Sequence, residues 1–197
     1  MTLDLTDEQL LTAFSRGQDQ AFEELVRRHG SGIKAYAQRM LRSEEAAEEI
    51  YVETFSRIVR ERNNIEIRGT TRGLLYTIAH RLCISRIRRR QTRRRFAPHL
   101  MAMEGGRSKQ PTSEDMAAAA ELSQALERAI ERLSEEHRQV LLLRTMHGLS
   151  SKETAEITGL EEGQVRSHLS YARKRLKVFL AELYEAPLVV RGEELAR

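Results

Sequence analysis

An arginine-rich segment is the part of this sequence with the clearest chemistry. Between Arg81 and Arg95, eight of fifteen residues are arginine and none is acidic. The guanidinium group stays protonated and binds phosphate through a planar fork of donors, so this segment suits a polyanion. DNA, RNA and anionic lipid all fit, and composition does not choose between them. A solvated helix end is the structural alternative, but the lack of any acid favours a polyanion partner.

Charge is segregated along the whole chain, although the formal net charge is only +4. Five glutamates and no base lie between Glu44 and Glu53. Residues 111–136 hold seven acids against two arginines, and residues 137–180 reverse to eight bases against four acids. Two basic zones separated by an acidic one indicate two separate contacts with a polyanion.

Residues suited to catalysis or metal binding are sparse. The six histidines lack metal-ligand spacing, and a single cysteine excludes a disulfide framework or a multi-cysteine metal centre. Cys83 lies beside Leu82 and Ile84 at helical spacing, which predicts a buried structural thiol. No phosphate-binding loop or nucleophile motif accompanies the glutamates. We therefore expect no metal, no cofactor, no small-molecule substrate and no enzymatic activity.

The elements that must position these charged groups are helices. Only 11 glycines and 3 prolines are present, which disfavours a turn-rich β fold. Apolar side chains recur at helical spacing, and Ser43 before Glu44 suits a helix N-cap. No apolar run approaches the ~20 residues of a membrane span, and the N-terminus lacks signal-peptide features. We predict an all-α, cytoplasmic protein without a membrane span.

A change of character near the middle divides the chain. Residues 97–116 include Pro98, Gly105, Gly106 and Pro111 and show little periodicity, which is typical of a flexible linker. The alanine run Ala117–Ala120 then opens a new helix. We expect two small helical domains, an N-terminal helical bundle over residues 1–96 and a second domain over residues 117–184, with a tail over residues 185–197.

Helix-capping and turn residues indicate a helix-turn-helix in the second domain. Ser134 can cap one helix, Ser150 and Glu153 match a capping box at the start of a short helix, and Gly159 can end it. A longer helix follows from Glu162. A short helix, a glycine turn and a longer helix form the layout of a DNA-binding helix-turn-helix.

The longer helix has a polar face opposite the apolar face of Val165, Leu169 and Ala172. A bundle helix with a solvated outer face is the structural alternative, but the capped short helix before it favours DNA recognition. Glutamine, serine and histidine can bond base edges, while lysine and arginine can hold phosphates. The candidate DNA-reading residues are Gln164, Arg166, Ser167, His168, Tyr171, Lys174 and Arg175.

Five segments in order resemble one known family. They are AFEELVRRHG (Ala21–Gly30), AEEIYVETFSRI (Ala47–Ile58), LLYTIAHRLCISRIRRR (Leu74–Arg90), the stretch Leu133–Leu160 and EGQVRSHLSYARKRL (Glu162–Leu176). With this spacing, over about residues 19–96 and 117–180, the chain resembles the extracytoplasmic-function (ECF) group of bacterial sigma factors. That group retains only regions two and four of larger sigma factors.

The resemblance implies a sigma factor that binds core RNA polymerase and promoter DNA and is controlled by an anti-sigma partner. It implies that Glu49, Glu53 and Phe55 dock on the polymerase. The connection Asn63–Gly73 and the helix from Leu74 into the arginines match the part that reads and opens the minus-ten element. The stretch Gln164–Arg175 matches the minus-thirty-five recognition helix. The candidate minus-ten contacts are Asn63, Asn64, Thr70, Thr71, His80, Arg81, Arg86, Arg88, Arg89 and Arg90.

The sequence departs from the family's pattern at several positions. These are Val52, Leu74, Arg81, Ser85, Gln164 and His168. Leu74, where tryptophan is common, is a packing change, whereas the others lie at contact positions. The departures at Val52, Arg81 and Ser85 leave open a helix-turn-helix regulator that binds duplex DNA independently of polymerase. The arginine-rich segment leaves open a third class, an RNA- or ribosome-associated helical protein.

Overall fold

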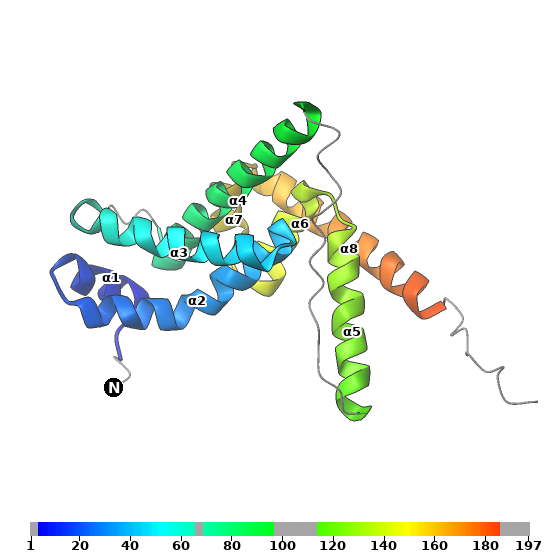
Figure 1. Cartoon of the computed structure of the whole chain (residues 1–197), viewed down its shortest axis with the longest axis horizontal. Helices are drawn as coiled ribbons and strands as arrows, with labels where there is room; N and C mark the ends of the chain where they lie inside the picture. The colour runs from blue at the N-terminus through cyan, green and yellow to red at the C-terminus, as the bar shows by residue number, and fades with distance from the viewer. Residues whose placement is uncertain (1–3, 66–68, 97–113, 186–197) are drawn as a thin grey trace, which may run out of the picture.

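The computed structural model describes residues 4–65, 69–96 and 114–185 of the 197-residue chain. Within these ranges all regular secondary structure is helical, which confirms the expected all-α class. Four α-helices form an N-terminal group, and four more, from Glu114 onward, form a C-terminal group (Figure 1).

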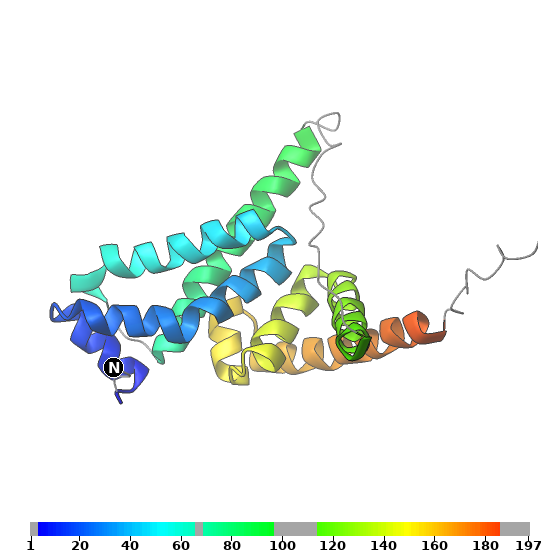
Figure 2. The ribbon, with the colours of Figure 1, turned by 60° about the horizontal axis from the view of Figure 1, so that its bottom comes forward.

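The N-terminal group is built around its second helix. Its elements are α1 (Asp7–Ser15), α2 (Asp19–Leu41), α3 (Glu44–Arg60), the 3₁₀ turn η1 (Arg62–Asn64) and α4 (Thr71–Phe96). Helix α2 packs against α1, α3 and α4. The arginine-rich end of α4 projects beyond the other helices of this group in both views (Figures 1 and 2).

Side-chain caps fix where these first helices begin. The hydroxyl of Ser43 accepts the N–H of Ala46 at 3.2 Å, so α3 begins where the sequence predicts. Helix α1 lies outside the segments that the sequence singles out. Its own signal is the capping box of Thr6 and Gln9, which satisfies two backbone N–H groups. Phe14 of this helix is buried and stacks on Phe22 of α2 at 4.8 Å between ring centroids.

The C-terminal group contains the expected helix-turn-helix. Its elements are α5 (Glu114–Glu131), α6 (Glu135–Leu141), the π-helical turn η3 (Leu142–Met146), α7 (Ser151–Thr158) and α8 (Glu162–Glu185). Helix α8 packs against α5, α6 and α7 (Figure 2). Helix α5 begins three residues before Ala117, since Glu114 and Asp115 suit a helix N-terminus. The rest of the predicted linker, residues 97–113, and the tail from residue 186 lie outside the described residues.

The turns around α7 have the predicted chemistry. Ser150 and Glu153 form a reciprocal capping box, with hydrogen bonds of 3.1 and 2.8 Å. Gly159 ends the helix with φ of +74°, in the left-handed region that glycine adopts most easily. Ser134 stands at the N-cap of α6, but its hydroxyl lies 2.5 Å from Nδ1 of His137 and makes no capping bond.

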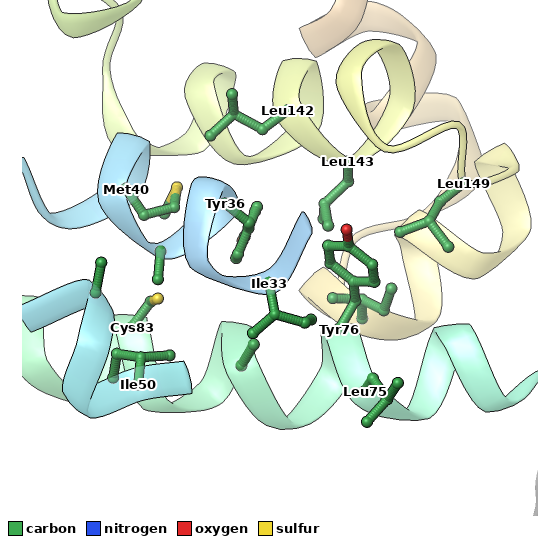
Figure 3. Close-up of a cluster of buried hydrophobic side chains, with 14 of the residues drawn as sticks. Ile33, Tyr36, Met40, Ile50, Leu75, Tyr76, Cys83, Leu142, Leu143 and Leu149 are labelled. Atoms are coloured by element: carbon green, nitrogen blue, oxygen red, sulfur yellow. The ribbon is translucent and has the colours of Figure 1, made fainter. Parts of the chain in front are cut away.

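The hydrophobic core continues from one helical group into the other. Tyr36 of α2 and Tyr76 of α4 lie next to Leu143 of η3 (Figure 3). These three side chains are at most 3% exposed. Because burial of apolar area is the main stabilising term in folding, the two groups stabilise each other in this arrangement.

Candidate nucleic-acid interface

The outer part of α4 is the most basic exposed surface of the described chain. Arg81, Arg86, Arg88 and Arg89 are all exposed there, and Arg90 is half-buried. These residues lie on a straight helix of 26 residues, so their guanidinium groups are spread along one rod. A row of this kind can follow successive phosphates of a nucleic-acid strand.

A groove of about 820 Å³ lies between this part of α4 and α7. Arg81, Arg88 and Arg93 line it from α4, while Glu156 and Gly159 line it from α7. The basic face of the first helical group therefore looks onto the second group in this arrangement. Glu156 is an acidic residue in the lining of this groove.

The beginning of α4 is covered by the C-terminal group. The hydroxyl of Thr70 donates to Glu153 Oε1 at 2.8 Å, and Arg72 donates to the backbone carbonyl of His147. Thr71 is buried, and its N–H donates to the carboxylate of Glu8 at 3.2 Å. Thr71 is thus enclosed by protein, whereas Thr70 is exposed but already bonded. The remaining candidates of this region, Asn63 and Asn64, are exposed in η1.

Two buried tyrosine–histidine pairs lie beneath this contact. Tyr36 Oη is 2.8 Å from Nδ1 of His80, and Tyr76 Oη is 2.8 Å from Nδ1 of His147. Burial, with Arg81 and Arg88 nearby, lowers the pKa of His80 to about 4. Burial, with Arg39 and Arg72 nearby, lowers the pKa of His147 to about 4.

His80 therefore has a different setting from the one that the family resemblance implies. Its side chain is 5% exposed and neutral at physiological pH. In this arrangement its ring bonds Tyr36 in the core between α2 and α4, and the residue also lines the groove beside Arg81 and Arg88.

Further polar contacts tie the two helical groups together. Arg39 of α2 forms an ion pair with Glu127 of α5 at 2.5 Å. The guanidinium of Arg138 donates to the carbonyl of Leu133 at 2.7 Å and reaches the carbonyl of Met40 at 3.4 Å. Arg138 is buried, and burial lowers its pKa to about 10. The Arg138 bonds satisfy carbonyls at the C-terminal end of α2 and in the turn that follows α5.

Helix α3 presents an acidic surface with an apolar centre. Glu49 is exposed and pairs with Arg86 of α4, which joins one residue from each of two predicted sites. Glu53 is half-buried, and hydrogen bonds from Arg57 and Arg60 hold the pKa of its carboxyl below the usual range. Phe55 is buried against Tyr51, with 5.3 Å between ring centroids. It therefore offers no exposed apolar anchor. Exposed apolar side chains on this helix are Val52 and Val59.

The polar face of α8 is accessible. Apolar residues Val165, Leu169 and Ala172 are buried against the other helices, as predicted. The opposite face is exposed at Gln164, Arg166, Ser167, Tyr171, Lys174 and Arg175, and His168 is half-buried. The N-terminal half of this helix can therefore enter a groove of a duplex, with the lysine and arginines placed for phosphates.

Some of these side chains already have local partners. Gln164 Oε1 accepts the N–H of Glu161 at 2.9 Å and so caps the start of α8. Arg166 lies 3.8 Å from Glu162, a weak surface ion pair. The Arg175 guanidinium lies over the ring of Phe179, 4.6 Å from its centroid. Gln164 and Arg175 therefore have structural roles, as a cap and as a packing contact, in addition to offering polar groups to a ligand.

His137 is a neighbour of this surface that periodicity does not point to. Its ring lies 4.3 Å from that of Tyr171 and 5.0 Å from that of His168, between centroids. The contact joins residues more than thirty positions apart, so only the folded chain brings them together. The local sequence signal is Ser134, three residues earlier, whose hydroxyl holds the ring.

Other candidate chemistry is limited in the described ranges. No group of three or more histidine, cysteine, aspartate or glutamate side chains could hold a metal ion there. Cys83 is buried as predicted, and burial raises the pKa of its thiol to about 12. Among the described helices, none is both long and apolar enough to cross a membrane.

Comparison with known families defines the class of protein. Residues 25–93 match the family described as sigma-70 region 2, and residues 123–176 match sigma-70 region 4. These ranges contain most of the basic helix α4 and of the helix-turn-helix. The class that these matches define is that of the sigma-70-type transcription initiation factors.

The relatives narrow the class. The ECF RNA polymerase sigma factor SigE of Mycolicibacterium smegmatis is 31% identical over 184 residues, covering 90% of this chain and 70% of the relative. SigW of Bacillus subtilis is 27% identical over 174 residues, covering 85% of this chain and 93% of the relative. This chain belongs to the ECF sigma factors. It binds core RNA polymerase and directs promoter-specific transcription initiation, which replaces the two other classes that the sequence left open.

Solved structures share the same fold. RpoE of Bartonella quintana, in complex with the anti-sigma factor NepR, matches with a TM-score of 0.67 at 22% identity, over 81% of this chain and 96% of that chain. CnrH, in complex with the cytosolic domain of CnrY, matches with a TM-score of 0.66 at 21% identity, over 89% of this chain and 97% of that chain.

Proposed function

We propose that the chain acts as two DNA-reading units joined by residues 97–116, within the domain limits 1–96 and 117–184. Helix α4 and η1 contact the minus-ten element, and the exposed face of α8 contacts the minus-thirty-five element. The observation that carries this proposal is the pairing of an exposed arginine row on α4 with an exposed polar face on a capped helix-turn-helix. The protein itself performs no catalysis, and it works in the cytoplasm, where core polymerase supplies the chemistry.

Core polymerase docks on the exposed face of α3. Glu49 and Glu53 supply the charge, and Val52 and Val59 supply the apolar area. An apolar centre inside a charged rim is the usual anatomy of a protein interface. Phe55 contributes from beneath by fixing the helix in the core.

An anti-sigma factor controls the chain by holding the two helical groups together. Support comes from the closed arrangement itself, in which Glu153 of α7 bonds the Thr70 hydroxyl and α7 forms one side of the groove beside Arg81 and Arg88. Bases of a melted minus-ten strand need that face free. Promoter binding therefore requires α4 and α7 to separate, and a partner that bridges them keeps the factor inactive.

Run-off transcription with purified core polymerase tests the function. We expect the chain to direct initiation from a subset of promoters in a library of genomic fragments, above the level of core polymerase alone. Transcription no higher than that of core polymerase, despite complex formation on a sizing column, would contradict the role as a sigma factor.

Two variants test the assignment of α8. Lys174→Ala should weaken binding to all promoters alike and reduce the log–log salt slope by roughly 0.9, because one phosphate contact is lost. His168→Ala should instead change which minus-thirty-five sequences are used. Equal losses across every promoter variant for His168→Ala would remove it from the base-reading residues.

A further inference from the structure

Three aromatic rings from two helices form a stack at the edge of the helix-turn-helix. His137 lies at the start of α6, and His168 and Tyr171 lie on the exposed face of α8. The ring planes of His137 and Tyr171 are inclined by 31°, with 4.3 Å between centroids. At this distance the two rings are in direct contact, so His137 forms part of the same surface.

The stack restricts how the α8 side chains point. Tyr171 is half-exposed, and one of its ring faces is occupied by His137. Nδ1 of His168 is enclosed and makes no hydrogen bond to the described residues, which leaves Nε2 as the nitrogen able to face a base edge. The hydroxyl of Ser134 holds the His137 ring from the other side at 2.5 Å. Fewer free rotamers before binding mean a smaller entropy cost on binding.

The surroundings of His137 disfavour the protonated form of its ring. The groups that face it are Ser134 and Glu136 on α6, and His168 and Tyr171 on α8. Partial burial and the neighbouring His168 lower the pKa of His137, while Glu136 opposes this shift. A DNA phosphate placed near the ring would add a negative charge, which favours the imidazolium form.

We propose that His137 is a positioning residue of the minus-thirty-five surface: it orders Tyr171 and His168 by stacking and takes up a proton from solvent as the duplex binds. This inference rests on the proposed role of α8. Thermodynamic linkage fixes the direction in which the duplex affinity changes with pH, because in this proposal DNA binding favours the protonated imidazole. Affinity for the duplex must therefore rise as the pH falls toward the pKa of free His137.

The test compares two substitutions that separate the ring from the proton. His137→Phe keeps an aromatic ring that cannot titrate, and His137→Ala removes the ring. Holoenzyme reconstituted from core polymerase and each full-length variant is titrated with a promoter duplex obtained from the run-off screen. Fluorescence anisotropy gives the affinity between about pH 8 and pH 6, the range in which histidine titrates. Lys174→Ala serves as the control for a phosphate contact made through α8.

The expected pattern is specific. His137→Phe binds like the wild type at the highest pH but gains less affinity on acidification. His137→Ala binds roughly two- to tenfold more weakly even at the highest pH, the worth of one ring pair. Wild-type affinity for His137→Ala, or a wild-type pH response for His137→Phe, would overturn the inference. If Lys174→Ala also binds like the wild type, the role of α8 itself fails instead.

Discussion

At the scale of single residues, neighbouring side chains on α3 have different roles: one packs in the core and another is exposed to a partner. Val52 is 52% exposed, whereas Phe55, three positions later, is 6% exposed and packs against Phe22 and Tyr51. Residues three apart point in directions about 60° apart around a helix. A small rotation of the helix therefore decides which of the two side chains meets a partner. Phe55 stabilises the helix, and Val52 remains for docking.

Replacing Val52 by glutamate should weaken binding to core polymerase. The substitution removes apolar area at the centre of the proposed interface and adds charge to an already acidic surface, so we expect about a tenfold loss of affinity. Surface plasmon resonance with core polymerase measures this affinity, and size-exclusion chromatography shows whether the complex still forms. Val178→Glu is the matched control, since Val178 is similarly exposed but lies on α8, in the other helical group. Equal losses for both variants would show that added charge alone is responsible.

Acidification should destabilise the folded chain through its buried histidines. His147 has a pKa of about 4 when folded, below its ordinary 6.5, so the unfolded chain binds a proton more readily. Its stabilising contribution is complete above about pH 6.5 and is lost as the pH falls toward 4, by up to about 3 kcal/mol. Urea unfolding across this range measures the effect. His147→Gln should show a shallower decline, and an identical decline would place the titration elsewhere.

At the scale of helices, the local end signals position the helix-turn-helix. The capping box of Ser150 and Glu153 begins α7, and Gly159 ends it in a left-handed conformation. These two signals set the length of α7 at eight residues and hence the point at which the chain turns into α8. Glu153 also accepts the hydroxyl of Thr70, so the same cap touches the first helical group.

Ser150→Ala should destabilise the helix-turn-helix by about 1 kcal/mol, the usual cost of losing an N-cap side chain. Thermal unfolding of the full chain measures it, and binding to the minus-thirty-five duplex should weaken in parallel. Ser151→Ala is the matched control, because Ser151 is the first residue of α7 and makes no cap. If the two variants were equally stable, the capping box would have no measurable part in forming α7.

The helix-turn-helix was predictable from sequence because caps and glycine turns act over three or four residues. The same locality explains α3 and its N-cap Ser43. The placement of His80 was not predictable, because its burial depends on Tyr36, forty-four residues earlier, and on the packing of α2 against α4. Sequence spacing shows that His80 shares a helix with the arginines. It does not show that the ring is buried and bonded to Tyr36.

At the scale of the whole molecule, the two helical groups form one continuous core. Tyr76 and His147 meet across it with a 2.8 Å hydrogen bond, and Arg39 pairs with Glu127 beside them. This contact covers part of the surface that α4 would offer to the minus-ten element. If α4 contacts the minus-ten element as proposed, the energy that stabilises the free chain opposes promoter binding, and core polymerase must supply enough binding energy to separate the groups.

Gly32 offers a direct way to test this opposition. A Cβ atom at Gly32 would lie 2.8 Å from Tyr76 Oη, too close for that hydroxyl to stay where it bonds His147, whereas Nδ1 of His147 would be in ordinary contact at 3.9 Å. Gly32→Val should therefore force α4 and η3 apart and increase the radius of gyration measured by small-angle scattering. The opened chain should also bind a single-stranded minus-ten oligonucleotide more tightly in the absence of polymerase, since the face of α4 is freed.

The neighbouring residue, Ser31, supplies the control for the Gly32→Val substitution. Ser31 is exposed on the same helix, so Ser31→Val adds the same side chain without touching the contact. It should leave both the radius of gyration and the oligonucleotide affinity unchanged. If Gly32→Val instead expands the chain without raising the affinity, the closed contact does not limit access to α4. The proposed control by an anti-sigma partner would then have to act through another surface.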